Sequence, residues 1–288
     1  MSSKQKRVLT IIEATLLIGT ILSIYHQTIA PKALVLKPEA SKVISKPSQS
    51  SSSQALPNDH NTQTIGGSST ATPKKLQVFY DLEKELADSP VPDVQNSVKV
   101  VNQNEPVIYY NAWDVPHIKY GQLDQLNRAT TATAYLTRDN LGKSKGREPQ
   151  TFKPTGWHNQ PTVIDGKRVF PQNRGHLIAY TLSFNFDAKG NTQTGASGSL
   201  DNPYNLITQT AYSNQEPMQI YEQKVRDALA QDKKVIYQVT PIFKDSELMA
   251  RGLWLQAESV DQSFKFSVFI ANIQPGVTFD YQTGRLIK

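Results

Sequence analysis

The alternation of apolar and polar residues in the C-terminal half of the chain predicts one helix and several strands. Residues 217–231 (PMQIYEQKVRDALAQ) begin with a proline, which suits a first helical turn. We expect Ile220, Val225 and Leu229 to form the apolar face of this helix. Four later segments alternate as strands do: 234–243, 253–260, 264–273 and 277–287. The expected fold class is therefore α+β, with a central helix against an antiparallel sheet.

The pattern before residue 217 is weaker and is broken by two long loops. Polar residues, glycines and prolines dominate 139–161 and 185–203, and loops of this length are usually functional or disordered. Between the loops, residues 163–170 predict a hairpin that turns at Asp165-Gly166, a favoured dipeptide for tight turns. Three further elements are expected: a short helix at 76–88, a strand at 107–112, and a turn leading into a strand at 121–136.

The first 30 residues have the pattern of an export signal. Three basic residues precede an apolar run at 8–25, which is near the minimum length for crossing a bilayer. Glu13 interrupts the run near its basic end, where it can reach the interface. Ala30 is followed by a proline, which signal-cleaving enzymes tolerate badly, so we favour an uncleaved signal-anchor over a removed signal peptide. The basic side is expected to stay cytoplasmic and the remainder to lie outside, either anchored or secreted.

Composition divides the rest of the chain into a spacer and a globular domain. Residues 31–75 are rich in serine, proline, glycine and threonine, and are expected to form a disordered linker. Residues 76–288 are expected to form a single domain. The whole chain carries a formal charge of +6, but residues 1–75 account for all of it, so overall basicity does not argue for nucleic-acid binding. The chain has no cysteine, which excludes disulfides and thiolate metal sites.

Basic residues are nevertheless concentrated at 138–176, which holds eight Lys/Arg against three Asp/Glu. This segment ends in NRGH at 173–176. In an extended chain Arg174 and His176 project to the same side. Imidazole can take a proton from water near neutral pH, and guanidinium can clamp a phosphate with two hydrogen bonds. Gly175 between them would permit close approach by a ligand. Taken alone, a surface ion pair and a histidine at a strand end explain these residues as well.

A series of polar residues follows at 201–226. Glu222 and Arg226 are four apart on the predicted helix and can form an ion pair. Asn214 lies eight residues before Glu222, but Pro217 places it just before the helix or in a separate turn. A carboxamide oxygen near a carboxylate suits a hard cation such as magnesium, which binds few protein ligands and keeps several waters.

Together, NRGHLIAY and NPYNLITQTAYSNQ…YEQKVR resemble the DNA/RNA non-specific endonuclease family, which has a ββα-metal (His-Me finger) core. The similarity is greatest to DNases that Gram-positive bacteria export or anchor. It extends over about residues 105–288 and includes YGQLDQLNRATTATAYL, Gly156-Trp157 and NIQPGVTFDYQTGRL. RGH is unspecific alone, but RGH followed by N-x3-Q-x4-N-x7-E-x3-R is strongly specific.

The resemblance implies a role for each matching residue. His176 would be the general base that deprotonates water, and Asn214 would be the protein ligand of a single Mg²⁺, for which Mn²⁺ can substitute. Glu222 would order metal-bound water, with the helix ion pair as its alternative. Arg174 and Arg226 would offset charge on the scissile phosphate. For Asn205 and Gln209 the resemblance implies polar positions that brace the site, and a purely structural role fits them equally well.

One residue departs from the family pattern. Asn173 stands where the family usually has Asp, which removes a negative charge beside Arg174 and the metal.

The basic loop at 138–153 is the candidate groove for a nucleic-acid backbone, with Lys143, Lys145 and Arg147 as candidate contacts. Contacts to phosphates predict little sequence preference and steep inhibition by salt. A solvated loop with no such role is the alternative.

The expected function is an extracytoplasmic, Mg²⁺-dependent, sugar-non-specific endonuclease that acts on DNA and RNA and leaves 5′-phosphate ends. The alternatives are a non-catalytic surface protein that holds DNA, with Asn173 marking a decayed site, and a toxin that acts on other cells. No protein partner can be inferred from the sequence.

Overall fold

The computed structural model describes residues 97–108, 113–143, 149–198 and 200–287, which belong to the second of two compact units of the chain, Asn61–Lys288. The expected signal-anchor, linker and helix at 76–88 lie outside the described residues. So does most of the expected strand at 107–112, whose two described residues are not in a strand. No helix in the described ranges is long and apolar enough to span a bilayer.

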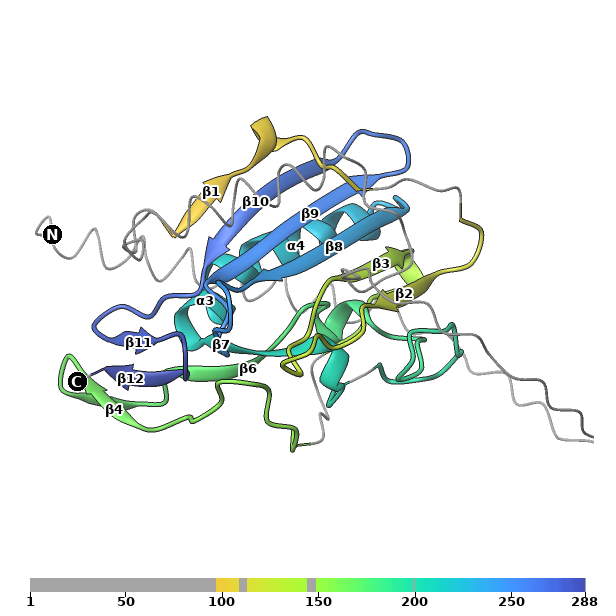
Figure 1. Cartoon of the computed structure of the whole chain (residues 1–288). Helices are drawn as coiled ribbons and strands as arrows, with labels where there is room; N and C mark the ends of the chain where they lie inside the picture. Colours follow the sequence, from red (N-terminus) through yellow and green to blue (C-terminus); the bar gives the residue numbers. More distant parts are fainter. Residues whose placement is uncertain (1–96, 109–112, 144–148, 199, 288) are drawn as a thin grey trace, which may run out of the picture. The chain divides into compact units, whose positions relative to one another are not determined.

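A six-stranded antiparallel sheet forms the centre of the described part of the chain (Figure 1). It contains three of the four segments predicted as C-terminal strands, and the strand predicted at the end of 121–136. In spatial order the strands are β1 (Val98–Val100), β10 (Lys265–Ala271), β9 (Gly252–Ser259), β8 (Val235–Ile242), β3 (Ala132–Leu136) and β2 (His117–Tyr120).

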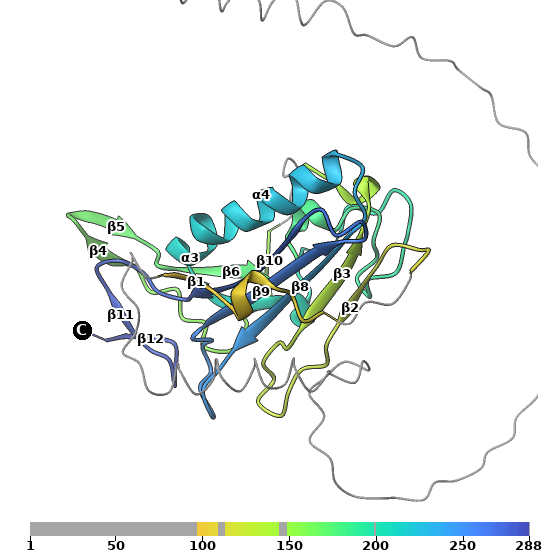
Figure 2. The same cartoon turned by 90° about the horizontal axis from the view of Figure 1, so that it is seen from above.

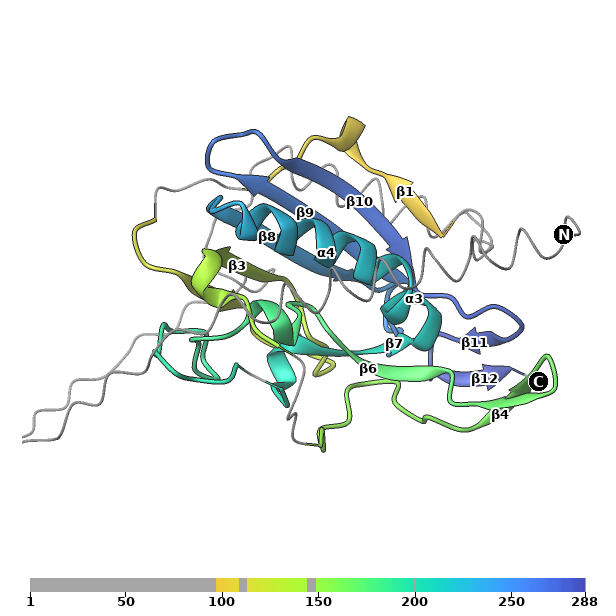
Figure 3. The same ribbon diagram turned by 180° about the vertical axis from the view of Figure 1, so that it is seen from behind.

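The predicted helix is α4 (Pro217–Ala230), and it lies across one face of this sheet (Figures 2 and 3). Its buried face presents Met218, Val225 and Leu229 to the apolar side chains of β8, β9 and β10. The prediction for Ile220 was wrong, because its side chain is 58% exposed. At 100° per residue, position 220 lies about 140° from position 225 and therefore points away from the sheet.

The opposite face of the sheet carries a second apolar cluster that includes Trp254 and Phe269, and beside it a set of buried polar side chains. The Gln238 amide donates to the Thr133 hydroxyl at 2.7 Å, and the Gln256 amide donates to the Gln238 oxygen at 3.3 Å. The backbone N–H of Val107 donates to the Gln256 oxygen at 2.7 Å, so the segment after β1 covers this face. The expected polar and apolar alternation is present, but β8 is buried at every position.

Two further strands form a separate ribbon below the sheet in Figure 1. β6 (Gln172–His176) pairs with β7 (Leu206–Thr210) in antiparallel register, so that Arg174 faces Thr208 and His176 faces Leu206. β7 leads directly into the short helix α3 (Ala211–Gln215), which a kink at Glu216 separates from α4. The succession β6, β7 and helix is a ββα unit.

Two small hairpins complete the strands. β4 (Thr162–Ile164) and β5 (Lys167–Val169) turn at Asp165-Gly166 as predicted, and both turn residues have positive φ. The segment 277–287 was predicted as one strand and is instead a hairpin of β11 (Thr278–Asp280) and β12 (Arg285–Ile287). The described parts of the two long loops contain no helix longer than a short 3₁₀ turn, and the second loop also holds an isolated antiparallel bridge between Phe186 and Thr192. The 3₁₀ turns among the described residues are Asn102–Asn104, Arg138–Asn140, Tyr180–Leu182 and Pro203–Asn205.

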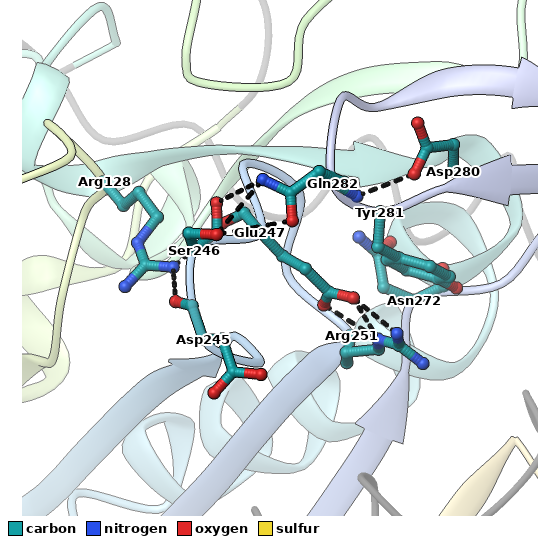
Figure 4. Close-up of polar contacts among 9 residues, drawn as sticks. All are labelled: Arg128, Asp245, Ser246, Glu247, Arg251, Asn272, Asp280, Tyr281 and Gln282. Carbon is teal, nitrogen blue, oxygen red and sulfur yellow. Dashed lines mark hydrogen bonds and ion pairs between the residues drawn. The ribbon is translucent and has the colours of Figure 1, made fainter.

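Polar contacts fasten the C-terminal hairpin to the segment between β8 and β9 (Figure 4). The Arg251 guanidinium donates to both oxygens of the Glu247 carboxylate and lies 4.8 Å from the centre of the Tyr281 ring. The Tyr281 hydroxyl donates to the carbonyl of Asn272 at 2.8 Å. The Asn272 side chain accepts from the N–H of Thr210 at 2.7 Å and donates to the Thr208 carbonyl at 3.1 Å. The end of the chain is thereby linked to β7.

Candidate active site

A cavity of about 500 Å³ lies where the end of β6 meets α3 and the start of α4. Most of its lining is polar. Of the predicted site residues, Asn173, Arg174, His176, Asn214 and Glu222 line it. The other lining residues are Gln150, Trp157, Asn159, Phe170, Gln172, Ala179, Tyr180, Thr181 and Gln219. Arg174 and His176 share this cavity because both belong to one strand, two positions apart.

The His176 ring is oriented by a backbone carbonyl. Its Nε2 lies 2.9 Å from the oxygen of Leu200, in the second long loop. A carbonyl oxygen only accepts, so Nε2 carries the proton in the neutral ring and Nδ1 carries the lone pair. The imidazole is half-buried and is set up as a proton acceptor at Nδ1.

Arg174 is held by an aromatic ring and a carbonyl. Its guanidinium carbon lies 4.5 Å from the centre of the Trp157 ring, and its Nε donates to the Phe152 carbonyl at 2.6 Å. Asp201 fixes the same segment by accepting from the N–H groups of Thr151 and Phe152 at 2.9 Å. Burial alone would raise the pKa of Asp201, but hydrogen bonds from Thr151 and Phe152 and the charge of Arg174 lower it. Asp201 thus fixes the segment whose Phe152 carbonyl holds Arg174, a role that the sequence did not single out.

Asn214 and Glu222 bring an amide and a carboxylate to the same cavity from consecutive helices. Asn214 lies near the end of α3 and Glu222 in the second turn of α4. Of the two predicted placements for Asn214, just before the helix or in a separate turn, the structure shows the second, since Asn214 lies in the separate short helix α3. Amide and carboxylate oxygens are the donors that Mg²⁺ prefers, so the lining fits a hard cation. The described residues contain no group of three or more His, Asp or Glu side chains placed to hold a metal.

Arg226 does not line the cavity. Its Nη1 lies 3.9 Å from Glu222 Oε2 and 3.3 Å from the Thr181 hydroxyl, while Nε and Nη2 donate to Gln223. The predicted helix ion pair is therefore present. Arg226 reaches the cavity only through Glu222 and Thr181.

Asn205 and Gln209 are both fully buried, and they support the chain on either side of His176. The Asn205 amide accepts from the N–H of Ile178 at 2.8 Å and donates to its carbonyl at 2.9 Å, which fixes the chain just after His176. Gln209 packs against Gly175, where a Cβ would lie 2.1 Å from Gln209 Oε1. The prediction that Gly175 admits a ligand was wrong, because the Gln209 side chain occupies that space.

The predicted groove residues are only partly placed. Lys143 is exposed and does not line the cavity, and Lys145 and Arg147 lie outside the described residues. Arg138, at the start of the same loop, is paired with Asp232 at 3.0 Å. The loop reaches the cavity through Gln150.

Gln172 organises the site and was not singled out by the sequence. Its side chain is 3% exposed and makes four hydrogen bonds. Its oxygen accepts from the N–H groups of His158 at 2.9 Å and Asn159 at 2.6 Å. Its nitrogen donates to the carbonyls of Gly284 at 2.7 Å and Gly156 at 3.3 Å. Gln172 thus joins the strand of His176, the segment of Trp157 and the C-terminal hairpin.

Replacing Gln172 by leucine is expected to lower the free energy of unfolding by about 3 kcal/mol or more, because buried backbone groups lose their partners at about 1–3 kcal/mol each. For a domain of this size that corresponds to a fall in Tm of about 6–12 °C, which calorimetry would measure. The matched control is Gln160→Leu at an exposed position, which should leave Tm within about 2 °C. Equal Tm values for the two variants would contradict this role of Gln172.

On the ββα unit this cavity brings together the imidazole of His176, the guanidinium of Arg174 and the side-chain oxygens of Asn214 and Glu222, a combination that suits a phosphodiester and a hard cation. A family model described as DNA/RNA non-specific endonuclease matches residues 106–261. The crystal structure of NucA from Streptococcus agalactiae with magnesium bound is 31% identical with a TM-score of 0.60, covering 76% of this chain and 98% of that one. The metal-free NucA structure is 30% identical with a TM-score of 0.58, covering 77% and 99%.

A curated protein named deoxyribonuclease, from Streptococcus dysgalactiae subsp. equisimilis, is 24% identical over an alignment of 200 residues that covers 60% of this chain. The matched part spans 61% of that relative's length. The chain belongs to the DNA/RNA non-specific endonuclease family, as its sequence predicted, and its ββα core on an α+β scaffold agrees with that membership.

Proposed function

We propose that this protein is a magnesium-dependent endonuclease that hydrolyses phosphodiester bonds in DNA and RNA and leaves 5′-phosphate ends. The observation that carries the proposal is the hydrogen bond from His176 Nε2 to the Leu200 carbonyl, beside Asn214 in one cavity. That bond fixes the tautomer in which Nδ1 can accept a proton from an attacking water.

The residues around the histidine have complementary roles. Arg174, held beside the Trp157 ring, offers its remaining N–H groups to the phosphate oxygens, where negative charge grows during the reaction. Arg226 supports the site indirectly, by fixing Glu222 and Thr181. Its predicted contact with the scissile phosphate therefore gives way to a positioning role in this proposal.

Asn214 would hold the divalent cation, with the Glu222 carboxylate beside it. A cation at this place would supply positive charge that stabilises the departing 3′ oxygen and thereby favours 5′-phosphate products. The protein's own groups hold the phosphate and accept the proton. Asn173 lines the same cavity without adding negative charge. In this proposal the side-chain oxygens available to the cation are therefore those of Asn214 and Glu222.

The proposal includes both nucleic acids because the groups assigned here address the phosphate. Contacts to phosphate oxygens carry no sequence information and do not touch the 2′ position of the sugar. We further propose that the domain acts outside the cytoplasmic membrane, because the basic residues followed by the apolar run 8–25 predict export with an anchor or a cleaved signal.

The test is digestion of double-stranded DNA, single-stranded DNA and RNA in parallel, with magnesium and with EDTA. We expect all three substrates to be cut with magnesium and none with EDTA, and the products to accept a label at a 5′ end only after phosphatase treatment. Binding of DNA without cleavage in any condition would contradict the proposal and favour a DNA-holding protein.

A further inference from the structure

A second cavity of about 440 Å³ adjoins the catalytic one and shares Phe170 with it. Phe170 and Pro171 follow β5 and lead into β6, while Tyr212, Gln215 and Glu216 come from α3 and the kink after it. α3 lines both cavities, since it carries Asn214 in the first and Tyr212 and Gln215 in the second, and the segment that lines the second cavity leads directly into β6, which carries His176. A ligand in the second cavity would therefore contact Phe170, which also lines the cavity of His176 and Asn214.

Phe170 is a solvent-exposed aromatic residue at the junction of the two cavities. Its side chain is 52% exposed, although the described core buries most other large apolar side chains. The guanidinium carbon of Arg168 lies 5.8 Å from the centre of its ring. Lys167 and Arg168 are both exposed on the β4–β5 hairpin. The ring thus stands beside positive charge, next to the catalytic cavity.

The chemistry of the second cavity suits a nucleobase better than a phosphate. The Glu216 carboxylate is exposed in it and would repel a phosphate. The same carboxylate and the Gln215 amide can accept hydrogen bonds from the exocyclic amines of bases. The aromatic rings of Phe170 and Tyr212 offer faces on which a base can stack. Lys167 and Arg168 on the β4–β5 hairpin can contact the phosphates of the strand that carries the base.

We propose that Phe170 is a stacking platform for the nucleobase next to the scissile phosphate, and that the cavity lined by Tyr212, Gln215 and Glu216 receives that base. The inference rests on the proposed function and extends it, because it names a base-binding subsite. A base can enter only after it leaves its neighbours in a duplex, so single-stranded segments are the substrates that fit most directly.

The experiment uses short single-stranded DNA in which one phosphodiester is cleavable and all other linkages are methylphosphonates. Three versions are compared: intact, abasic on the 5′ side of the cleavable bond, and abasic on its 3′ side. KM is measured with magnesium, and Kd is measured by fluorescence anisotropy in EDTA. The proteins are the wild-type chain, Phe170→Ala, Phe170→Tyr, and Val163→Ala as a control, since Val163 is 67% exposed on the same hairpin and lines neither cavity.

For wild type, removing the base on one side is expected to raise KM and Kd by about fivefold to a hundredfold, the range for loss of one base–aromatic stack. Phe170→Ala should show the same rise with the intact substrate and no further rise with the abasic one. Phe170→Tyr should keep values near those of wild type, and Val163→Ala should match wild type throughout.

Two outcomes overturn the subsite. The first is that KM and Kd of Phe170→Ala equal those of wild type. The second is that Phe170→Ala raises KM and Kd for the abasic DNAs by the same factor as for the intact DNA. Failure of the proposed function gives a different result, because the wild type would then bind the intact DNA and leave it uncut with magnesium. The Kd comparison in EDTA decides the subsite even in that case.

Discussion

Replacing His176 by alanine is expected to lower kcat for DNA cleavage by about a hundredfold to ten-thousandfold, the usual contribution of a positioned general base. The physical reason is the loss of the His176 imidazole, whose Nδ1 accepts the proton while its Nε2 is bonded to the Leu200 carbonyl. Retention of DNA should change little, because Arg174 and the exposed lysines remain. Nicking of supercoiled plasmid and filter retention of the same DNA measure the two properties separately.

His158→Ala is the matched control for this variant. Nε2 of His158 also contacts a backbone carbonyl, that of Thr283 at 2.9 Å, but the residue does not line the catalytic cavity. We expect kcat for His158→Ala to stay within a few-fold of wild type. If His176→Ala cleaves DNA as fast as this control, the histidine has no part in the reaction.

Replacing Asn214 by alanine is expected to raise the magnesium concentration for half-maximal cleavage by tenfold or more. Removal of its amide oxygen leaves Glu222 as the protein donor assigned to the cation. The measurement is a magnesium titration of the initial rate, with wild type alongside.

Asn214→Asp keeps an oxygen donor at the same position and adds negative charge, so it should recover most of the magnesium affinity lost in Asn214→Ala. An alanine variant with an unchanged magnesium titration would remove Asn214 from the cation site.

The features that sequence predicted correctly are those encoded by local spacing. Arg174 and His176 share a cavity because alternate residues of a strand face one side, and the sequence NRGH already shows this spacing. Asn214 was placed outside the helix of Glu222 because Pro217 marks a helix start, and it lies in α3, before α4. The hairpin at Asp165-Gly166 follows from turn chemistry alone.

The features that sequence reasoning missed depend on residues distant along the chain. Nothing local to Gln172 predicts that its partners are Gly156, the N–H groups of His158 and Asn159, and Gly284. The role of Gly175 is likewise set by Gln209, which reaches it only because β7 pairs with β6. Ile220 differs for another reason: it is apolar, but its angle around the helix axis turns it away from the sheet and into solvent.

The bond between Gln172 and the Gly284 carbonyl makes the last hairpin part of the catalytic scaffold. A protease that cut the chain between β10 and β11 would leave every residue that lines the reaction cavity in place. The Gly284 carbonyl, which anchors the start of the histidine strand, would then be held in place by non-covalent contacts alone. Clipping near the carboxyl end is thus a route to silencing the enzyme at a distance from its reacting groups.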